Sequence, residues 1–187
     1  MRCPWCPADD PLYVAYHDEE WGVPCRDGRH LFEMINLEGA QAGLSWRTIL
    51  HKRARYREVF EGFDPKVLSR WTDAKVAQAL LDPGIVRNRL KVAGVVRNAR
   101  ALMKQFDGDV EAFSAFLWSH VGNKPVQNKF TATTQVPAKT EVSDQLSKAL
   151  QKMDFTFVGS TICYAFMQAV GMVNDHLTTC PREKQVR

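Results

Sequence analysis

Glu38 is the residue best placed to do chemistry, because it is an acid on the apolar side of a predicted helix. Leu31, Met34 and Ile35 precede it by seven, four and three residues, so all four side chains fall on one stripe. A carboxylate there must find partners or take up a proton, since burying it unpaired is costly. A capping or paired core acid is the commoner outcome of such a pattern. The segment GAQAGLSW that follows, with its small residues and large flat Trp46, favours a functional acid.

A second group of reactive side chains stands at the two ends of the chain. Cys3, Cys6 and His17 lie near the start, and His176 and Cys180 lie four residues apart near the end, where one helical turn would direct both towards one ion. Two cysteines and two histidines make a closed tetrahedral zinc site. Free thiols and surface imidazoles fit the spacing equally well, since no CxxC pair repeats at both ends. Cys6 is a competing ligand.

Cations gather around a tight turn in LLDPGIVRNRLKVAGVVRNAR, residues 80–100. Pro83 and Gly84 predict a turn between a helix that ends at Asp82 and the next helix. Backbone N–H groups at such a helix N-terminus can hold a phosphate without reading sequence. An ordinary helix connection would have the same Pro-Gly pair, so the cations carry the argument. They are Arg87, Arg89, Lys91, Arg97 and Arg100.

The elements that position these groups are predicted from caps and apolar spacing. Asp27 or Gly28 starts the helix that carries Glu38, Ser45 caps the helix WRTILHKRARYREVF, and Thr72 caps the helix before the turn. The cations of the second helix fit a solvated face. They are Lys52, Arg53, Arg55 and Arg57.

Later segments continue the helical pattern. A helix is predicted from Asp109, Ser143 caps the helix DQLSKALQKM, and VGSTICYAFMQAVGMV predicts an apolar core helix. Residues 1–26 form an irregular arm, and the polar stretch 122–142 is long enough to suggest function or mobility. No segment is a convincing strand, so we expect a nearly all-helical protein.

The composition is typical of a globular protein. Of 187 residues, 45% are hydrophobic and 25% charged, which suits one domain or two packed lobes. No apolar run is long enough to span a bilayer and the N-terminus lacks a signal peptide, so we expect a cytoplasmic protein with no membrane partner. A net charge of +4 permits a nucleic-acid partner without requiring one. The odd count of five cysteines argues against a disulfide framework.

Three long segments, together with the terminal cysteines and histidines, resemble the bacterial 3-methyladenine DNA glycosylase I family. The segments are DPLYVAYHDEEWGVP, LFEMINLEGAQAGLSW and FVGSTICYAFMQAVGMVNDH. The resemblance implies an all-α, helix-hairpin-helix DNA glycosylase-like bundle. Residues 1–187 would form a single compact unit of two packed helical lobes, with the helix-hairpin-helix near 72–106 and zinc-tethered termini at 1–26 and 172–187.

The resemblance assigns a base pocket to matching positions. Glu38 and Tyr16 would hydrogen-bond the base, Trp46 would stack on it, and Trp21 is a candidate further wall. A structural zinc would be ligated with all four places filled and none left for water. The implied ligands are Cys3, His17, His176 and Cys180. Because Tyr16 directly precedes a ligand, the zinc would also fix Tyr16 beside the pocket.

The implied partner is double-stranded DNA that contains alkylated adenine, with a monomer as the default state of the protein. Leu44, in the turn at Gly43, is a candidate plug for the gap left by the flipped base. The hairpin residues assigned to DNA are Gly84, Arg87, Arg89 and Lys91. Asn88 stands near the place of the lysine nucleophile of related glycosylases, which argues for hydrolysis without strand cleavage. Many helix-hairpin-helix glycosylases also have an aspartate beyond the next helix, which the family resembled here is thought to lack. Asp107 and Asp109 are the candidates for that aspartate in this sequence.

The implied reaction needs little acid catalysis, because methylation at N3 makes the base cationic and weakens its glycosidic bond. The enzyme must flip the nucleotide and offer a pocket that prefers a cation. A carboxylate about 4 Å from a unit charge contributes roughly 4 kcal/mol at an effective dielectric near 20, and aromatic rings add roughly 1 to 2 kcal/mol. We therefore assign Glu38 to base recognition and to electrostatic support of an oxocarbenium-like state.

Two other kinds of function stay open. A zinc-stapled helix-hairpin-helix module could bind damaged DNA without catalysis, in which case abasic DNA would be bound tightly and no base released. A catalytic zinc in another hydrolase would need three protein ligands and a water, whereas four protein ligands would exclude it.

Overall fold

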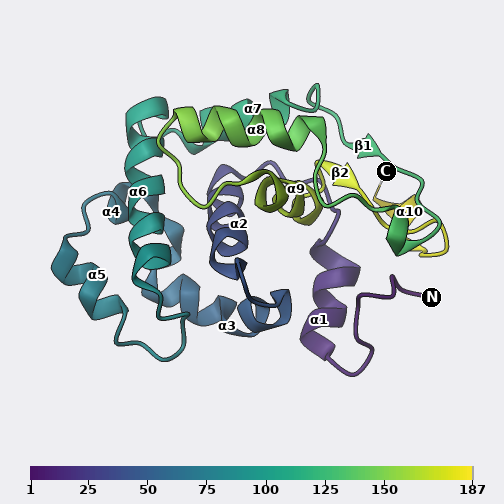
Figure 1. Ribbon diagram of the computed structural model, residues 1–187, viewed down its shortest axis with the longest axis horizontal. Helices are drawn as coiled ribbons and strands as arrows, with labels where there is room; N and C mark the ends of the chain where they lie inside the picture. The colour runs from purple at the N-terminus through teal and green to yellow at the C-terminus, as the bar shows by residue number, and fades with distance from the viewer. Residues whose placement is uncertain (187) are drawn as a thin grey trace.

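The computed structural model describes residues 1–186, and its elements are almost all helical (Figure 1). Arg187, the last residue of the predicted unit 1–187 and of the predicted tether 172–187, lies outside the described residues. The helices and helical turns are α1 (Pro11–Ala15), η1 (Tyr16–Glu20), α2 (Gly28–Gln41), α3 (Trp46–Val59), η2 (Glu61–Phe63), α4 (Pro65–Leu68), α5 (Asp73–Ala79), α6 (Arg89–Phe106), α7 (Val110–Ser119), η3 (Thr133–Gln135), α8 (Glu141–Lys152), α9 (Ser160–Ala169) and α10 (Arg182–Gln185). The strands are β1 (Val126–Gln127) and β2 (Val173–Asn174).

Helix α2 is the centre of the fold, packed by α3, α6, α7 and α9 (Figure 1). Every residue from 31 to 40 is buried, so the helix is enclosed on all sides and not only along the predicted stripe. Such burial is typical of a central helix rather than of a surface helix. The predicted all-α fold is confirmed. Within the described chain, no helix combines the length and apolar character needed to cross a membrane.

The predicted helix starts are correct for four helices and wrong for one. The side chains of Asp27, Ser45, Thr72 and Asp109 accept hydrogen bonds from the first turns of α2, α3, α5 and α7. Helix α8, however, is capped by Thr140, whose Oγ1 accepts from the N–H of Ser143. The Ser143 hydroxyl in turn accepts from the Thr140 N–H. The prediction took the second member of a reciprocal cap for the first.

Three other predictions about secondary structure are wrong. The apolar helix ends at Ala169, because Gly171 takes a left-handed φ of 70°, and β2 then pairs in parallel with β1. Two-residue strands leave no alternation in a sequence to be recognised. The predicted irregular arm 1–26 contains α1 and the π-helical turn η1. His176 and Cys180 follow β2 in non-helical backbone rather than sharing a helical turn.

The hairpin between α5 and α6 is held by α3. The guanidinium of Arg55 binds Asp82, with Nε 2.9 Å from Oδ2, and the Lys52 ammonium donates to the carbonyl of Pro83 at 3.1 Å. The Tyr56 hydroxyl accepts from the N–H of Val86 at 3.1 Å. The predicted solvated face of α3 is confirmed for Arg55 and Arg57, which are exposed even though they bind other parts of the chain. It is wrong for Arg53, which is buried. The preceding helix also stops at Ala79, short of the predicted Asp82.

Candidate active site

A cavity of about 390 Å³ opens beside η1, α2, α3 and the segment after β2. Its walls combine five aromatic side chains with five polar and three aliphatic ones. The lining residues are Trp5, Tyr13, Tyr16, Trp21, Glu38, Gln41, Trp46, Thr133, Val136, Ala165, Gln168, Asp175 and Leu177. All four predicted base-pocket residues belong to this set.

Aromatic rings form two connected pairs in the cavity wall. The centroids of Tyr16 and Trp46 are 5.3 Å apart, and those of Trp5 and Trp21 are 4.7 Å apart. Tyr13 joins the pairs, with its ring 6.3 Å from Tyr16 and 5.8 Å from Trp5. The indole N–H of Trp46 is buried and has no partner in the described chain. The wall can therefore stack against a flat ring and still offers an unused donor.

The Glu38 carboxyl is buried, with 5% of the residue exposed. Within the described part of the chain it has no hydrogen-bond or ion-pair partner, and it faces the cavity. Burial raises its pKa to about 8, although the positive charge of Arg53 opposes the rise. An unpaired acid beside a cavity is the arrangement expected of a group reserved for a ligand.

The guanidinium of Arg53 binds two other carboxylates and not that of Glu38, although its Nη2 has no hydrogen-bond partner in the described chain. Its Nε donates to Oε1 of Glu33 at 2.7 Å, and its Nη1 donates to Oε2 of Glu20 at 2.7 Å. Burial acts to raise the pKa of Glu20, but the neighbouring His30 ring and a hydrogen bond from Arg53 hold it at about 2. The charge of Arg53 is thereby shared mainly with Glu20 and Glu33, and Glu38 stays without a hydrogen-bond partner among the described residues.

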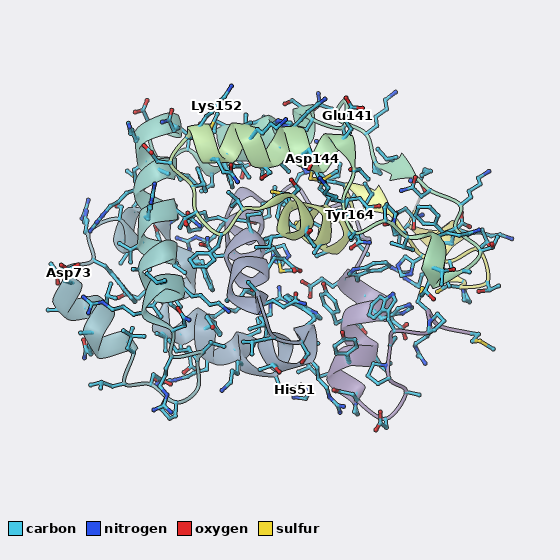
Figure 2. The ribbon with its side chains drawn as sticks, viewed as in Figure 1. His51, Asp73, Glu141, Asp144, Lys152 and Tyr164 are labelled. Atoms are coloured by element: carbon cyan, nitrogen blue, oxygen red, sulfur yellow. The ribbon has the colours of Figure 1, made fainter. Side chains whose placement is uncertain are left out.

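Asp175 is a second buried carboxylate in the cavity wall and was not predicted. It accepts from the Tyr164 hydroxyl at 2.7 Å, from Nε2 of Gln168 at 2.8 Å and from Nδ2 of Asn128 at 2.7 Å. Figure 2 shows Tyr164 on α9, below α8. Because its partners come from α9 and from the loop after β1, Asp175 ties that loop to the core. Its place in NDH, directly before His176, was the only signal in the sequence.

Trp5 and Tyr13 were also missed. Tyr13 lies three residues before Tyr16, a spacing that places both on one face of a helix, and this signal could have identified it. Trp5 carried no such signal, because its position depends on the fold of the first ten residues around His17, whose ring is 5.1 Å from the indole.

A buried carboxylate also joins the two helices that flank the cavity. Asp10, which caps α1, accepts from Nε of Arg47 and lies 2.8 Å from Nε2 of His51, both on α3. Figure 2 shows His51 at the lower edge, where α3 faces α1. This contact fixes Tyr16, at the end of α1, relative to Trp46, at the start of α3.

The four predicted zinc ligands converge. One donor atom from each lies within 4.8 Å of the others, and all four residues are buried. The Sγ of Cys3 is 3.6 Å from Nδ1 of His176, and the Sγ of Cys180 is 3.7 Å from Nε2 of His17. Tetrahedral zinc bonds would place sulfur and nitrogen roughly 3.6 Å apart. Cys6 is outside this set, with its Sγ 3.9 Å from the carbonyl oxygen of Tyr13.

The remaining nitrogen of each histidine in this set is also occupied. The Nδ1 of His17 lies 2.8 Å from Oδ1 of Asp18, and the Nε2 of His176 lies 2.9 Å from the carbonyl oxygen of Trp21. Metal-bound histidines commonly have such partners, which fix the ring and its tautomer. The residues therefore fit a tetrahedral ion, and the second contact would link such an ion to Trp21, which lines the cavity.

The residues assigned to DNA divide into two groups. Arg87 and Arg89 are exposed and have no partner in the described chain, and Leu44 is 42% exposed beside Gly43. Lys91, in contrast, donates to backbone carbonyls of the segment before Leu44.

Gly84 and Asn88 serve the hairpin itself. The Gly84 N–H donates to Oδ1 of Asp82, and a Cβ at position 84 would lie 2.4 Å from Cγ of Arg55. Asn88 caps α6 by accepting from the N–H of Lys91. These contacts account for both residues without a bound phosphate or a nucleophile. Of the candidate aspartates, Asp109 caps α7, and neither Asp109 nor Asp107 lines the cavity.

Comparison with known proteins gives consistent matches over nearly the whole chain. The family model described as methyladenine glycosylase matches residues 5–183. DNA-3-methyladenine glycosylase 1 of Escherichia coli (strain K12) is 50% identical over 96% of this chain and 95% of its own length. A crystal structure of 3-methyladenine DNA glycosylase I has a TM-score of 0.93 at 49% identity, covering 97% of this chain and 98% of that one. A structure that concerns 3-methyladenine recognition by the Staphylococcus aureus glycosylase has a TM-score of 0.90 at 35% identity, covering 94% and 93%.

Proposed function

Because the chain belongs to the methyladenine glycosylase family, we propose that its aromatic cavity receives the base during excision of 3-methyladenine. The chain is a DNA glycosylase that flips the nucleotide and hydrolyses the N-glycosidic bond of 3-methyladenine in alkylated DNA without strand cleavage. A damage-binding module without catalysis is not favoured, since relatives of about half identity are glycosylases. The observation that carries the site assignment is the unpaired, buried carboxyl of Glu38 at the cavity.

The roles in the pocket follow from the shape and chemistry of its walls. A cavity of about 390 Å³ is within the usual range for small-ligand sites. Trp46 stacks on the flipped purine, Tyr16 and Glu38 hydrogen-bond its edge, and Trp21 forms a further wall together with Trp5. Offset or tilted aromatic contacts of this kind contribute roughly 0.5 to 1.5 kcal/mol each.

The charge state of Glu38 supports selection of a cationic base. With a pKa of about 8, the carboxyl of the empty pocket is mostly protonated at neutral pH. A cation about 4 Å away favours the carboxylate by roughly 4 kcal/mol at an effective dielectric near 20. Ionising an acid one pH unit below its pKa costs about 1.4 kcal/mol, so the methylated base drives the proton off and neutral adenine does not. The resulting carboxylate also stabilises positive charge that develops on the sugar.

A structural zinc completes the proposal. Cys3, His17, His176 and Cys180 would hold it, and the buried set of two thiolates and two imidazoles suits zinc and leaves no place for water. The ion would link the N-terminal segment to the segment after β2 and would supply no step of the reaction. A catalytic zinc in another kind of hydrolase is therefore disfavoured.

The DNA-facing surface is proposed from exposure and free donors. Leu44 enters the gap left by the flipped nucleotide from the turn at Gly43, where a Cβ would meet nothing within 4 Å. Arg87 and Arg89 contact the backbone of double-stranded DNA. In the described hairpin the N–H group of Gly84 has a partner, but those of Ile85 and Arg87 have none. The N–H groups of Ile85 and Arg87 are therefore the proposed donors to a DNA phosphate. The protein acts as a cytoplasmic monomer in this proposal.

The decisive experiment identifies, by chromatography, the bases that the purified protein releases from methylated duplex DNA. We expect 3-methyladenine as the main product and no strand breaks before alkaline treatment. Elemental analysis of the same preparation should give one zinc per chain. Tight binding to abasic DNA with no free base would overturn the catalytic assignment, and an ordered water as a zinc ligand would overturn the structural one.

A further inference from the structure

Lys91 stands among the hairpin cations but does not face solvent as they do. It is the third residue of α6, and its Nζ donates to the carbonyl oxygen of Ala40 at 2.8 Å and to that of Ala42 at 2.5 Å. Arg87 and Arg89 are exposed and have no partner in the described chain. The hairpin therefore contains two kinds of cation, and Lys91 belongs to the internally bound kind.

The carbonyls that Lys91 binds lie at the C-terminal end of α2 and have no hydrogen-bond donor within that helix. Helix α2 ends at Gln41, and the last carbonyls of a helix have no donor within it. The Gln41 carbonyl accepts from the N–H of Leu44 at 2.6 Å. Those of Ala40 and Ala42 are both satisfied by one ammonium group, which has three donors and a charge suited to a helix C-terminus.

The segment that Lys91 holds carries two proposed functional residues. Glu38 lies two residues before Ala40, and Leu44 lies two residues after Ala42. In the described chain, no side chain other than Lys91 donates a hydrogen bond to residues 40–44. Helices α2 and α6 pack side by side (Figure 1), so a rigid element of the hairpin is joined to an otherwise lightly held turn.

From this geometry we infer that Lys91 is a positioning residue, which holds the turn bearing Leu44 at a fixed place relative to the DNA-binding hairpin and does not itself bind phosphate. The inference rests on the proposed roles of Leu44 and the hairpin. Lys91 would thereby fix the distance between the hairpin, which binds the DNA backbone, and Leu44, which enters the duplex. Partial burial lowers the pKa of the Lys91 ammonium.

The experiment separates a phosphate contact from a positioning contact. Each phosphate contact contributes about 0.9 to the slope of log affinity against log salt. Lys91→Met should leave this slope unchanged for a duplex with a stable abasic analogue, whereas Arg89→Met should reduce it by about 0.9. Single-turnover release of 3-methyladenine at saturating protein should fall about tenfold in Lys91→Met and recover in Lys91→Arg, which can still donate to both carbonyls.

Three controls make the outcome decisive. Lys152→Met removes a charge on α8, far from the hairpin (Figure 2), and should change neither quantity. Should Lys91→Met not fold, Lys91→Gln, whose amide can reach one carbonyl, carries the same test. If Leu44→Ala releases base at the wild-type rate, the proposed role of Leu44 fails independently of Lys91. A reduced salt slope in Lys91→Met, or an unchanged single-turnover rate, overturns the inference.

Discussion

Glu33 and Glu38 lie on the same helix, α2, and are buried to a similar degree, but among the described residues only Glu33 has hydrogen-bond partners. Glu33 is 7% exposed and Glu38 is 5% exposed. The Oε1 of Glu33 accepts from Nε of Arg53 at 2.7 Å and from Nε of Arg57 at 2.9 Å. Glu38 has no partner in the described chain and faces the aromatic cavity. Burial alone therefore does not distinguish the two acids, whereas the absence of a partner does.

The difference has a cause in the neighbouring helix. Arg53 and Arg57 lie on α3 opposite the first half of α2, where they meet Glu33, and the second half of α2 faces Tyr16 and Trp46 instead. The commoner outcome expected of an acid on an apolar stripe, a paired core acid, describes Glu33. Glu→Gln substitutions at the two positions should therefore have opposite consequences.

The largest effect should be a pH-dependent gain of stability in Glu38→Gln. The pKa of Glu38 is about 8 in the fold and 4.5 as an ordinary side chain. Its stabilising proton is therefore fully present below pH 4.5 and is lost as pH rises through 8. The loss amounts to about 5 kcal/mol at roughly 1.4 kcal/mol per pH unit. Urea unfolding of both proteins should give nearly equal free energies at pH 5 and a clear advantage for the variant at pH 8.5. An advantage that is the same at both pH values would contradict a protonated Glu38.

Glu33→Gln should have the opposite effect, a loss of about 3 kcal/mol of stability at neutral pH. Removing one partner leaves the buried Arg53 with an incomplete set of carboxylates, which is costly in a low dielectric. Glycosylase activity per folded molecule should stay within about threefold of the wild type, because Glu33 does not line the cavity. Thermal or urea unfolding measures the loss. A variant as stable as the wild type would mean that the ion pairs with α3 contribute nothing.

Glycosylase activity should respond in the opposite way from stability, because it should fall in Glu38→Gln and be nearly unchanged in Glu33→Gln. Glu38→Gln keeps the size of the side chain but cannot become negative, and the release of 3-methyladenine should fall about 100-fold, which corresponds to about 2.7 kcal/mol of transition-state stabilisation. Trp46→Ala should also lose most of the release, because the stacking wall is gone. Single-turnover assays at saturating protein measure both, with circular dichroism to verify the fold. Retained activity in both variants would refute the pocket.

The sequence predicted the helices and the pocket acid because those features are local. Caps such as Asp27 and Ser45, and the apolar spacing before Glu38, act within one or two turns of chain. The failures came from features that need a distant partner. Strand β2 exists only because β1 lies beside it, and the burial of Arg53 could not be recognised without Glu33 and Glu20, which lie on other elements.

The site shows the same division. The base-binding roles of Tyr16, Trp46 and Trp21 followed from resemblance to a family, whereas apolar spacing alone marked only Glu38 among the pocket residues. The sequence groups Lys91 with Arg87 and Arg89 because all three are cations that follow the turn, and nothing in one dimension reveals the carbonyls that Lys91 binds. A cation in a basic segment is thus assigned securely only when its own partners are known.

The smallest effect, and the one that separates the two protonation states of Glu38, is the pH dependence of kcat/KM. This quantity reports groups of the free enzyme, so a pKa of about 8 should make it rise roughly tenfold between pH 7 and pH 9 if the carboxylate selects the cationic base. Glu33→Gln should retain that rise, and Glu38→Gln should lose it. A kcat/KM that falls over this range would show that the protonated acid is the active form, with Glu38 donating a hydrogen bond to the base. Glu38 would then differ from Glu33 because it donates a hydrogen bond where Glu33 accepts, and not because of its charge.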